Sequence, residues 1–158
     1  MTISKKEAIL ARVELRINEI KTTAFAYDDV LYANDIGYVD RQFKNITQQD
    51  IQQRGMNWVI INEMRESWKP LIGGPFENKL QLQIILFTRL LQEEENLSTK
   101  MNSLQKDIRL AMLKDVELDG LCSYLVPVST QPVDNMVSPY DGSVMYFDIT
   151  YVTQGMDI

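Results

Sequence analysis

The segment from Ser143 to Val152 constrains the fold of this chain more strongly than any other. Phe147, Ile149 and Tyr151 alternate with polar residues in it, and a period of two places these three side chains on one face of a β-strand. Asp141–Gly142 is a favourable turn sequence directly before this segment. The chain is therefore expected to contain a sheet with an apolar face.

Two other segments repeat with the period of an α-helix. Ser4 and Glu7 have the spacing of a capping box, which predicts a helix start at this point. The apolar stripe that follows comprises Ile9, Val13, Ile17 and Ile20. In the second segment Asn96 or Ser98 can cap the helix, and the apolar series is Leu97, Met101, Leu104, Ile108 and Ala111. Each stripe predicts a helix that packs through one face.

The remaining segments predict further strands joined by two long loops. Strands are expected where β-branched, aromatic or alternating residues prevail, at Gly37–Phe43, Trp58–Ile61, Lys79–Phe87 and Leu121–Val128. Gly73–Pro75 favours an exposed loop over residues 67–78. Pro132 and Pro139 favour a second loop over residues 129–142. Long loops of this kind are often functional.

Two segments admit a second interpretation, and a third predicts a short helical turn. Residues from Thr22 to Asn34 fit either a short helix or an irregular hydrophobic segment that ends in a turn at Asp35–Gly37. Residues from Thr47 to Gly55 fit a short capped helical turn with a glycine stop. A single helix from Leu80 to Lys114 is the alternative to a strand followed by a separate helix.

These elements predict one α+β domain over residues 1–158. The expected architecture is a small mixed or antiparallel sheet of about four to five strands with two main helices packed on it. A chain of 158 residues is long enough for one substantial hydrophobic core and leaves no room for a second domain. The composition, with 45% hydrophobic residues, is that of a chain that folds on its own.

The composition also restricts the chemistry that the chain can perform. It contains no histidine, which removes Ser–His and Cys–His nucleophilic sites and every metal site that uses histidine. The net charge of -6 disfavours specific nucleic acid binding, which depends on Lys and Arg. No segment has the glycine pattern of a nucleotide-binding loop. We therefore expect no enzymatic activity and no cofactor.

Cys122 lies in an apolar segment and is expected to be a buried free thiol, since the chain has no second cysteine. No apolar run reaches the roughly 18 residues that a membrane-spanning helix needs, and the segment from Met1 to Leu10 is too polar for a signal-peptide core. We therefore expect a chain that is cytosolic when synthesised and has no membrane partner.

Two acidic segments are candidates for a metal site. Asp28, Asp29, Asp35 and Asp40 could supply oxygen ligands or acid/base groups, and they are the basis of an alternative in which the chain is a carboxylate-dependent metal enzyme. Residues 115–120 match the first half of an EF-hand loop. The twelfth position of that loop is valine where calcium binding needs glutamate, so a turn after a helix is the preferred interpretation.

The order of elements resembles the tail terminator or tail-completion proteins of long-tailed bacteriophages, the group that includes the lambda-type minor tail protein U. The segments that carry this resemblance are the helix Leu97–Lys114, the turn Leu118–Gly120, the strand Leu121–Val128 and the final strand Phe147–Tyr151. A helix before Asp35 completes the outline. The resemblance is one of layout over most of the chain and includes no short diagnostic motif.

The resemblance implies a structural virion protein. Its copies would form a ring, expected to be a hexamer, that is assembled in the host cytoplasm, caps the tail tube and joins it to a head or neck protein. The two predicted loops are the candidate docking surfaces, and the residues singled out in them are Trp68, Pro70, Pro75, Phe76, Pro132, Met136, Pro139 and Tyr140. A small adaptor that binds a partner at a sheet edge is the second functional hypothesis.

Overall fold

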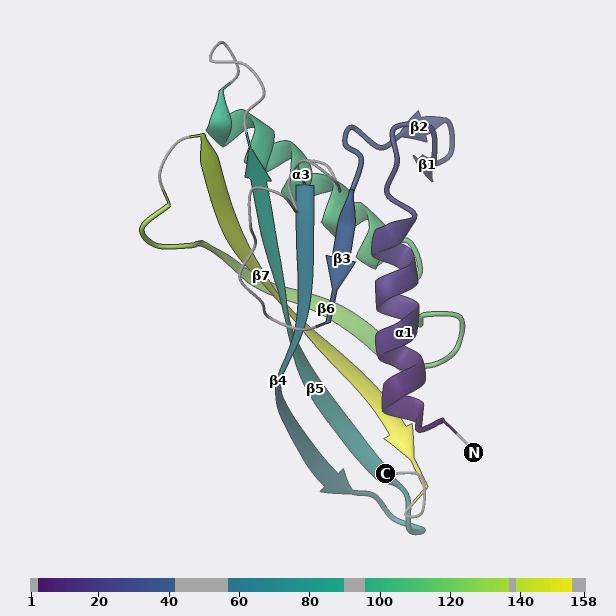
Figure 1. Ribbon diagram of the computed structural model, residues 1–158. Helices are drawn as coiled ribbons and strands as arrows, with labels where there is room; N and C mark the ends of the chain where they lie inside the picture. The colour runs from purple at the N-terminus through teal and green to yellow at the C-terminus, as the bar shows by residue number, and fades with distance from the viewer. Residues whose placement is uncertain (1–2, 42–56, 90–95, 137–138, 155–158) are drawn as a thin grey trace.

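The computed structural model is an α+β fold with a five-stranded sheet and two helices (Figure 1). It describes residues 3–41, 57–89, 96–136 and 139–154. The sheet has the order β3 (Tyr38–Asp40), β4 (Asn57–Pro70), β5 (Phe76–Arg89), β7 (Tyr140–Thr153) and β6 (Tyr124–Pro132). The β3–β4 pair is parallel and the other pairs are antiparallel, so the sheet is mixed. The predicted fold class is confirmed.

Both helices start at the predicted caps. Helix α1 (Lys5–Asn18) is capped by the Ser4 hydroxyl, which accepts a hydrogen bond from the backbone N–H of Glu7. Helix α3 (Leu97–Leu113) is capped by the Asn96 side chain, which accepts from the backbone N–H of Thr99 at 3.1 Å. Both caps satisfy a backbone N–H that has no partner inside the helix.

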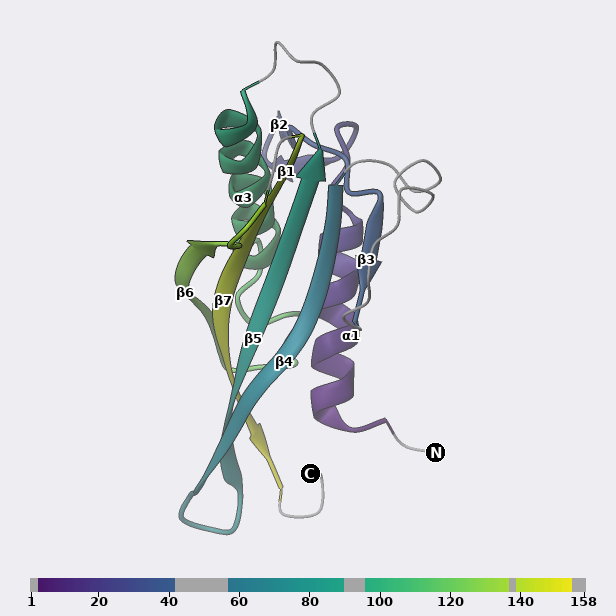
Figure 2. The ribbon, with the colours of Figure 1, turned by 60° about the vertical axis from the view of Figure 1, so that its left-hand side comes forward.

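The two helices cover one face of the sheet, where the main core lies (Figure 2). All four residues of the first predicted helical stripe are buried in this core, and so are all residues of the second stripe except Leu97, which is half-buried. On β7, Phe147, Ile149 and Tyr151 are buried beneath the helices as predicted. Cys122 is also buried and free. A smaller apolar cluster of Ile60, Ile85 and Val144 lies apart from this core.

The segment that fitted either a short helix or irregular structure forms a separate β-hairpin. Its strands are β1 (Phe25–Tyr27) and β2 (Val30–Leu31). Asp28 adopts a φ of 44° in the turn between them, a conformation that aspartate tolerates better than most residues. Strands this short carry too little alternation to be recognised from their sequence.

The two predicted loops are strand at both of their ends. Strand β4 continues to Pro70 and β5 begins at Phe76, so the expected loop at 67–78 is a hairpin whose turn spans residues 71–75. Likewise β6 continues to Pro132 and β7 begins at Tyr140. The prediction extended the loops too far because residues 67–70 and 129–132 are exposed and show no apolar alternation, whereas pairing with a neighbouring strand satisfies their backbone groups.

The other boundary predictions have mixed outcomes. The single helix from Leu80 to Lys114 is wrong, because strand β5 occupies the first part of that range. The predicted strand at Gly37–Phe43 is confirmed over Tyr38–Asp40, and the one at Leu121–Val128 begins three residues later. The helical turn expected between Thr47 and Gly55 lies outside the described residues. Within the described ranges, no helix has the length and apolarity to cross a membrane.

Candidate functional site: the β4–β5 arm

The turn end of the β4–β5 hairpin extends beyond the N-terminal end of α1 (Figures 1 and 2). We call residues 62–82 the arm. Strand β3 pairs with β4 over Trp58–Ile60, so in the described part of the chain the outer edge of β4 has no partner strand along the arm. An unpaired edge leaves backbone N–H and C=O groups available to another chain.

The arm carries three large apolar side chains that are exposed to solvent. Met64 is 48% exposed, Trp68 58% and Ile72 104%. The turn that holds Ile72 includes Gly73 and Gly74, which adopt φ angles of 96° and 103°. Residues with side chains rarely adopt these angles, so the two glycines allow the tight turn that places Ile72 at the tip.

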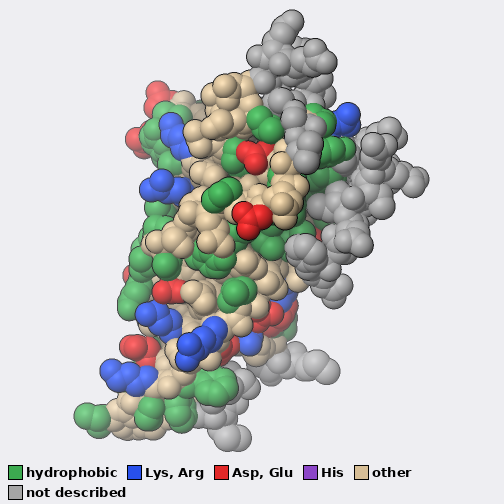
Figure 3. All heavy atoms as spheres, turned by 90° about the vertical axis from the view of Figure 1, so that its left-hand side faces the viewer, with side chains coloured by type: hydrophobic (Ala, Val, Ile, Leu, Met, Phe, Trp, Pro, Cys, Tyr) green, Lys and Arg blue, Asp and Glu red, His purple; other side chains and the backbone are tan. Residues whose placement is uncertain are grey.

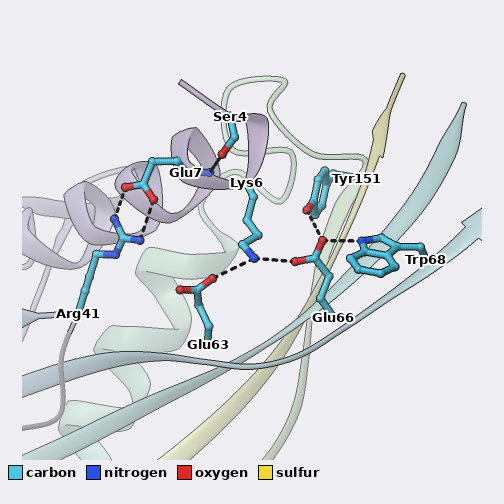
Figure 4. Close-up of polar contacts among 8 residues, drawn as sticks. All are labelled: Ser4, Lys6, Glu7, Arg41, Glu63, Glu66, Trp68 and Tyr151. Carbon is cyan, nitrogen blue, oxygen red and sulfur yellow. Dashed lines mark hydrogen bonds and ion pairs between the residues drawn. The ribbon is translucent and has the colours of Figure 1, made fainter. Parts of the chain in front are cut away.

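A carboxylate fixes the arm to the start of helix α1 (Figure 4). The register of β4 against β5 shifts between Glu63 and Glu66, and such a bulge re-aims the side chains around it. Glu66 Oε2 lies 2.9 Å from Lys6 Nζ, and Glu66 Oε1 accepts hydrogen bonds from Trp68 Nε1 and Tyr151 Oη, both at 2.9 Å. Glu63 is a second, longer partner of Lys6 at 3.4 Å.

Partial burial and mutual hydrogen bonds shift the pKa values of Glu66, Lys6 and Tyr151. Burial by itself raises the pKa of Glu66, but the hydrogen bonds from Lys6, Trp68 and Tyr151 outweigh it and leave that pKa below its ordinary value. The Glu66 hydrogen bond raises the pKa of Lys6. Burial, together with Glu66, raises the pKa of Tyr151. Glu66 is therefore an ionised anchor that orients the indole of Trp68.

A second ion pair holds the same end of α1. Arg41, which follows β3, binds both carboxylate oxygens of Glu7, with one contact at 3.0 Å (Figure 4). The Arg41 hydrogen bond lowers the pKa of Glu7, as expected for a two-point guanidinium–carboxylate contact. The N-terminal turn of α1 is thus tied to β3 on one side and to the arm on the other.

We predict that Glu66→Gln makes the protein less stable at neutral pH and less sensitive to acid. The lowered pKa of Glu66 means that its stabilising effect is present above its ordinary pKa of 4.5 and is lost as the pH falls through the lower, folded-state pKa. Because the cluster is partly exposed, the expected loss at pH 7 is about 1 kcal/mol.

Urea unfolding of both proteins between pH 3 and pH 7 measures this effect. The difference in unfolding free energy between wild type and Glu66→Gln is expected to shrink as the pH drops below 4.5. Glu77→Gln, also on the arm, is the matched control, since among the residues that the structure describes none forms an ion pair or a side-chain hydrogen bond with Glu77. A difference that stays constant down to pH 3 would contradict the assigned role of Glu66.

The predicted docking residues form two groups at opposite ends of the sheet. Trp68, Pro70, Pro75 and Phe76 belong to the arm. Pro132, Met136, Pro139 and Tyr140 lie near the other end of β7, where Tyr140 pairs with Arg89 of β5 and the guanidinium lies 5.8 Å from the tyrosine ring centroid. Phe76 pairs with Thr153 at the far end of β7. The two groups therefore do not form one surface.

The candidate metal ligands do not converge in the described residues. Asp35 accepts hydrogen bonds from the backbone and side chain of Thr22, while Asp40 accepts from the backbone N–H of Arg41. Asp115 accepts from the backbone of Glu117 and Asp119, as in a turn after a helix. Among the residues that the structure describes, no three His, Cys, Asp or Glu side chains are grouped to hold a metal ion.

Two further surfaces were missed by reasoning from sequence. The β1–β2 hairpin exposes Phe25, Tyr27, Val30 and Leu31, and strand β6 exposes Tyr124, Val126 and Val128. Both segments are apolar in sequence, and apolar residues are more often buried than exposed. The sequence carries one indication of these surfaces. Apolar residues in both segments do not alternate with polar ones, which is the pattern of a segment that contacts protein on both faces.

Comparison with known proteins adds no further constraint. A scan against protein-family models finds no match, and a search of the curated proteins finds none. The function therefore has to be argued from the geometry of the chain itself.

Proposed function

We propose that this chain is a structural virion protein that forms a ring on the end of a phage tail tube and joins the tube to the head or neck. The ring is a homo-oligomer, expected to be a hexamer, assembled in the host cytoplasm. The arm docks on the tail tube, and other surfaces join neighbouring copies. The resemblance in the order of elements suggests this role, and the α+β architecture is compatible with it.

The observation that carries the proposal is the fixed exposure of apolar side chains on the arm. Trp68 and Ile72 lie in water at the end of a projecting hairpin, where they contribute nothing to the core. Glu66 nevertheless orients the Trp68 indole through a 2.9 Å hydrogen bond. Large aromatic side chains held in place before binding are typical of residues that dominate binding energy in protein interfaces.

The face of the sheet opposite the helices supports a docking role for the arm. Lys and Arg side chains gather over the arm end of this face, next to hydrophobic ones (Figure 3). Arg65 and Lys79 line a shallow pocket there together with Asp148, and Lys79 lies 3.9 Å from that aspartate. A mixture of charged and apolar side chains is typical of interfaces between proteins that also exist apart.

We predict that the double variant Trp68→Ala/Ile72→Ser loses binding to tail-tube ends. Removing both apolar anchors is expected to weaken binding at least about tenfold, since each residue of this type contributes 1 kcal/mol or more. Co-sedimentation with purified tail tubes, followed by electron microscopy of their ends, measures the effect. Thermal unfolding close to that of wild type would show that the fold is retained.

Leu15→Ser is the matched control, because Leu15 is also an exposed apolar residue, at 46%, but lies on α1. It should leave tube binding unchanged. A wild-type chain that binds no tube end and remains monomeric would overturn the proposed function, whereas a double variant that binds normally would overturn the role of the arm.

A second candidate function is a small adaptor that binds an extended peptide at the β6 edge. The observation in its favour is a shallow polar pocket between α3 and β6, lined by Asn102 and Gln105 of the helix and Thr130–Pro132 of the strand. Helix-flanked strand edges accept an additional strand in several peptide-binding domains. A strict monomer that captures extended peptides would favour this function over the ring.

A further inference from the structure

The β1–β2 hairpin presents a concentrated apolar surface. Phe25, Tyr27, Val30 and Leu31 are each between 43% and 55% exposed, and Asp28–Asp29 is exposed at the turn between the strands. Single exposed apolar residues are common, but four within seven consecutive positions mark an interaction surface. The acidic turn gives this surface a charge as well as an apolar character.

The hairpin is held rigidly at its base. Ala26 and Tyr32 are buried in the main core. The buried Asp107 carboxylate of α3 accepts hydrogen bonds from the backbone N–H groups of Ala33 and Asn34, the second at 2.8 Å. A partner that docks on the hairpin therefore meets a surface that is already ordered, which lowers the entropic cost of binding.

A surface of complementary character lies along α3 and β6. Strand β6 is the last strand of the sheet, contains no charged residue, and exposes Tyr124, Val126 and Val128 to between 42% and 51%. Arg109 of α3 lines a pocket of about 270 Å³ together with Val128. We call these four residues and Lys106 the α3–β6 flank.

The charges of the two surfaces are opposite. Lys106 and Arg109 are exposed on α3, and neither forms a salt bridge within the described part of the chain. Because each copy carries a net charge of -6, two copies repel one another unless their contact places opposite charges together. Asp28–Asp29 on the hairpin and the basic residues of the flank provide such a contact.

We infer that the β1–β2 hairpin of one copy docks on the α3–β6 flank of a second copy. Asp28–Asp29 then lies beside Arg109, and the apolar side chains of the hairpin cover those of β6. The two surfaces differ and both belong to every copy, so the contact is head-to-tail and repeats from copy to copy. Such a contact gives a ring when the rotation between successive copies closes. This inference rests on the proposed function, for which it identifies the surfaces between subunits.

The first test is cross-linking between chains that carry one cysteine each. In a Cys122→Ser background, one chain carries Tyr27→Cys and another carries Val126→Cys. A short bis-maleimide reagent is expected to yield covalent dimers when the two chains are mixed. Neither chain alone is expected to yield dimers, because a head-to-tail contact does not place two copies of the same residue together.

The second test exchanges the charges. Asp28→Lys/Asp29→Lys and Lys106→Glu/Arg109→Glu should each weaken self-association at least about tenfold, because each places like charges in the contact. An equimolar mixture of the two variants restores opposite charges at every contact, and light scattering should then show assembly close to that of wild type. All four residues are exposed. Thermal unfolding verifies that the fold is retained, including at Asp28, whose φ of 44° suits lysine less well than aspartate.

The outcomes separate the inference from the proposed function. Mixed-chain cross-links together with rescue by charge exchange would support the inference. Wild-type assembly without mixed-chain cross-links, or without rescue, would overturn the inference and leave the ring intact as a proposal. A chain that stays monomeric and binds no tube end would overturn both.

Discussion

Alanine in place of Phe147 is expected to lower the free energy of unfolding by about 4 kcal/mol, which is the typical cost of removing a fully buried phenylalanine side chain. Phe147 is 0% exposed and is among the largest fully buried side chains of the described core. It lies on β7, which pairs with both β5 and β6. Several elements would therefore enclose the cavity that the missing ring leaves, and they cannot all move inward to fill it.

Urea unfolding followed by circular dichroism measures this loss. Phe147→Leu, which keeps most of the apolar volume, is expected to cost about 1 kcal/mol. Leu113→Ala is the control on a side chain that is 39% exposed, and it should change the unfolding free energy by less than about 0.5 kcal/mol. A loss below about 1 kcal/mol in Phe147→Ala would show that this site is not packed as described.

The second large effect is expected at Asp107. Asp107 is 2% exposed. Its carboxylate accepts hydrogen bonds from the Ala33 amide at 3.1 Å, the Asn34 amide at 2.8 Å and the Asn34 side chain at 2.8 Å. Asp107→Ala leaves these donors without their acceptor. The expected decrease in the free energy of unfolding is about 2 kcal/mol, because these part-buried donors lose their acceptor and α3 loses its contact with the base of the hairpin.

Hydrogen exchange distinguishes this effect from a general loss of stability. In Asp107→Ala the amides of Ala33 and Asn34 should exchange faster relative to those of the β5–β7 core, because the hairpin base is released locally. Asn102→Ala, at an exposed position of the same helix, is the control and should leave the exchange of these amides unchanged. Equal acceleration throughout the sheet would contradict a local anchoring role.

Asp107 also illustrates how structure corrected the interpretation of the sequence. In the sequence it lies between the apolar positions Leu104 and Ile108 of a helical stripe, where an acidic residue would be assigned to the solvent face. Its partners Ala33 and Asn34 are more than 70 positions away in the chain. The pattern of neighbouring residues contains no information about contacts between such distant positions. The role of Asp107 therefore could not be predicted from the sequence.

The docking residues were predicted in part. Gly73–Pro75 correctly indicated a turn, and Trp68 is exposed next to it. What the sequence did not indicate is that Trp68 lies on a strand, or that Lys6 and Tyr151, from the two ends of the chain, meet Glu66 beside it. The β1–β2 hairpin and the β6 edge were missed because their apolar residues are exposed, contrary to the usual rule.

The two helices, the buried face of β7 and the α+β class can be predicted from local sequence alone. Helix caps and the periods of 3.6 and 2 are local properties, and burial of an amphipathic face requires only that some apolar partner exists. The lengths of the strands, the arm with its anchor at Glu66, and the choice of apolar residues that stay exposed to solvent depend on the tertiary structure. These features depend on which backbone edges pair and which distant side chains meet, and such pairings arise only when the whole chain has folded.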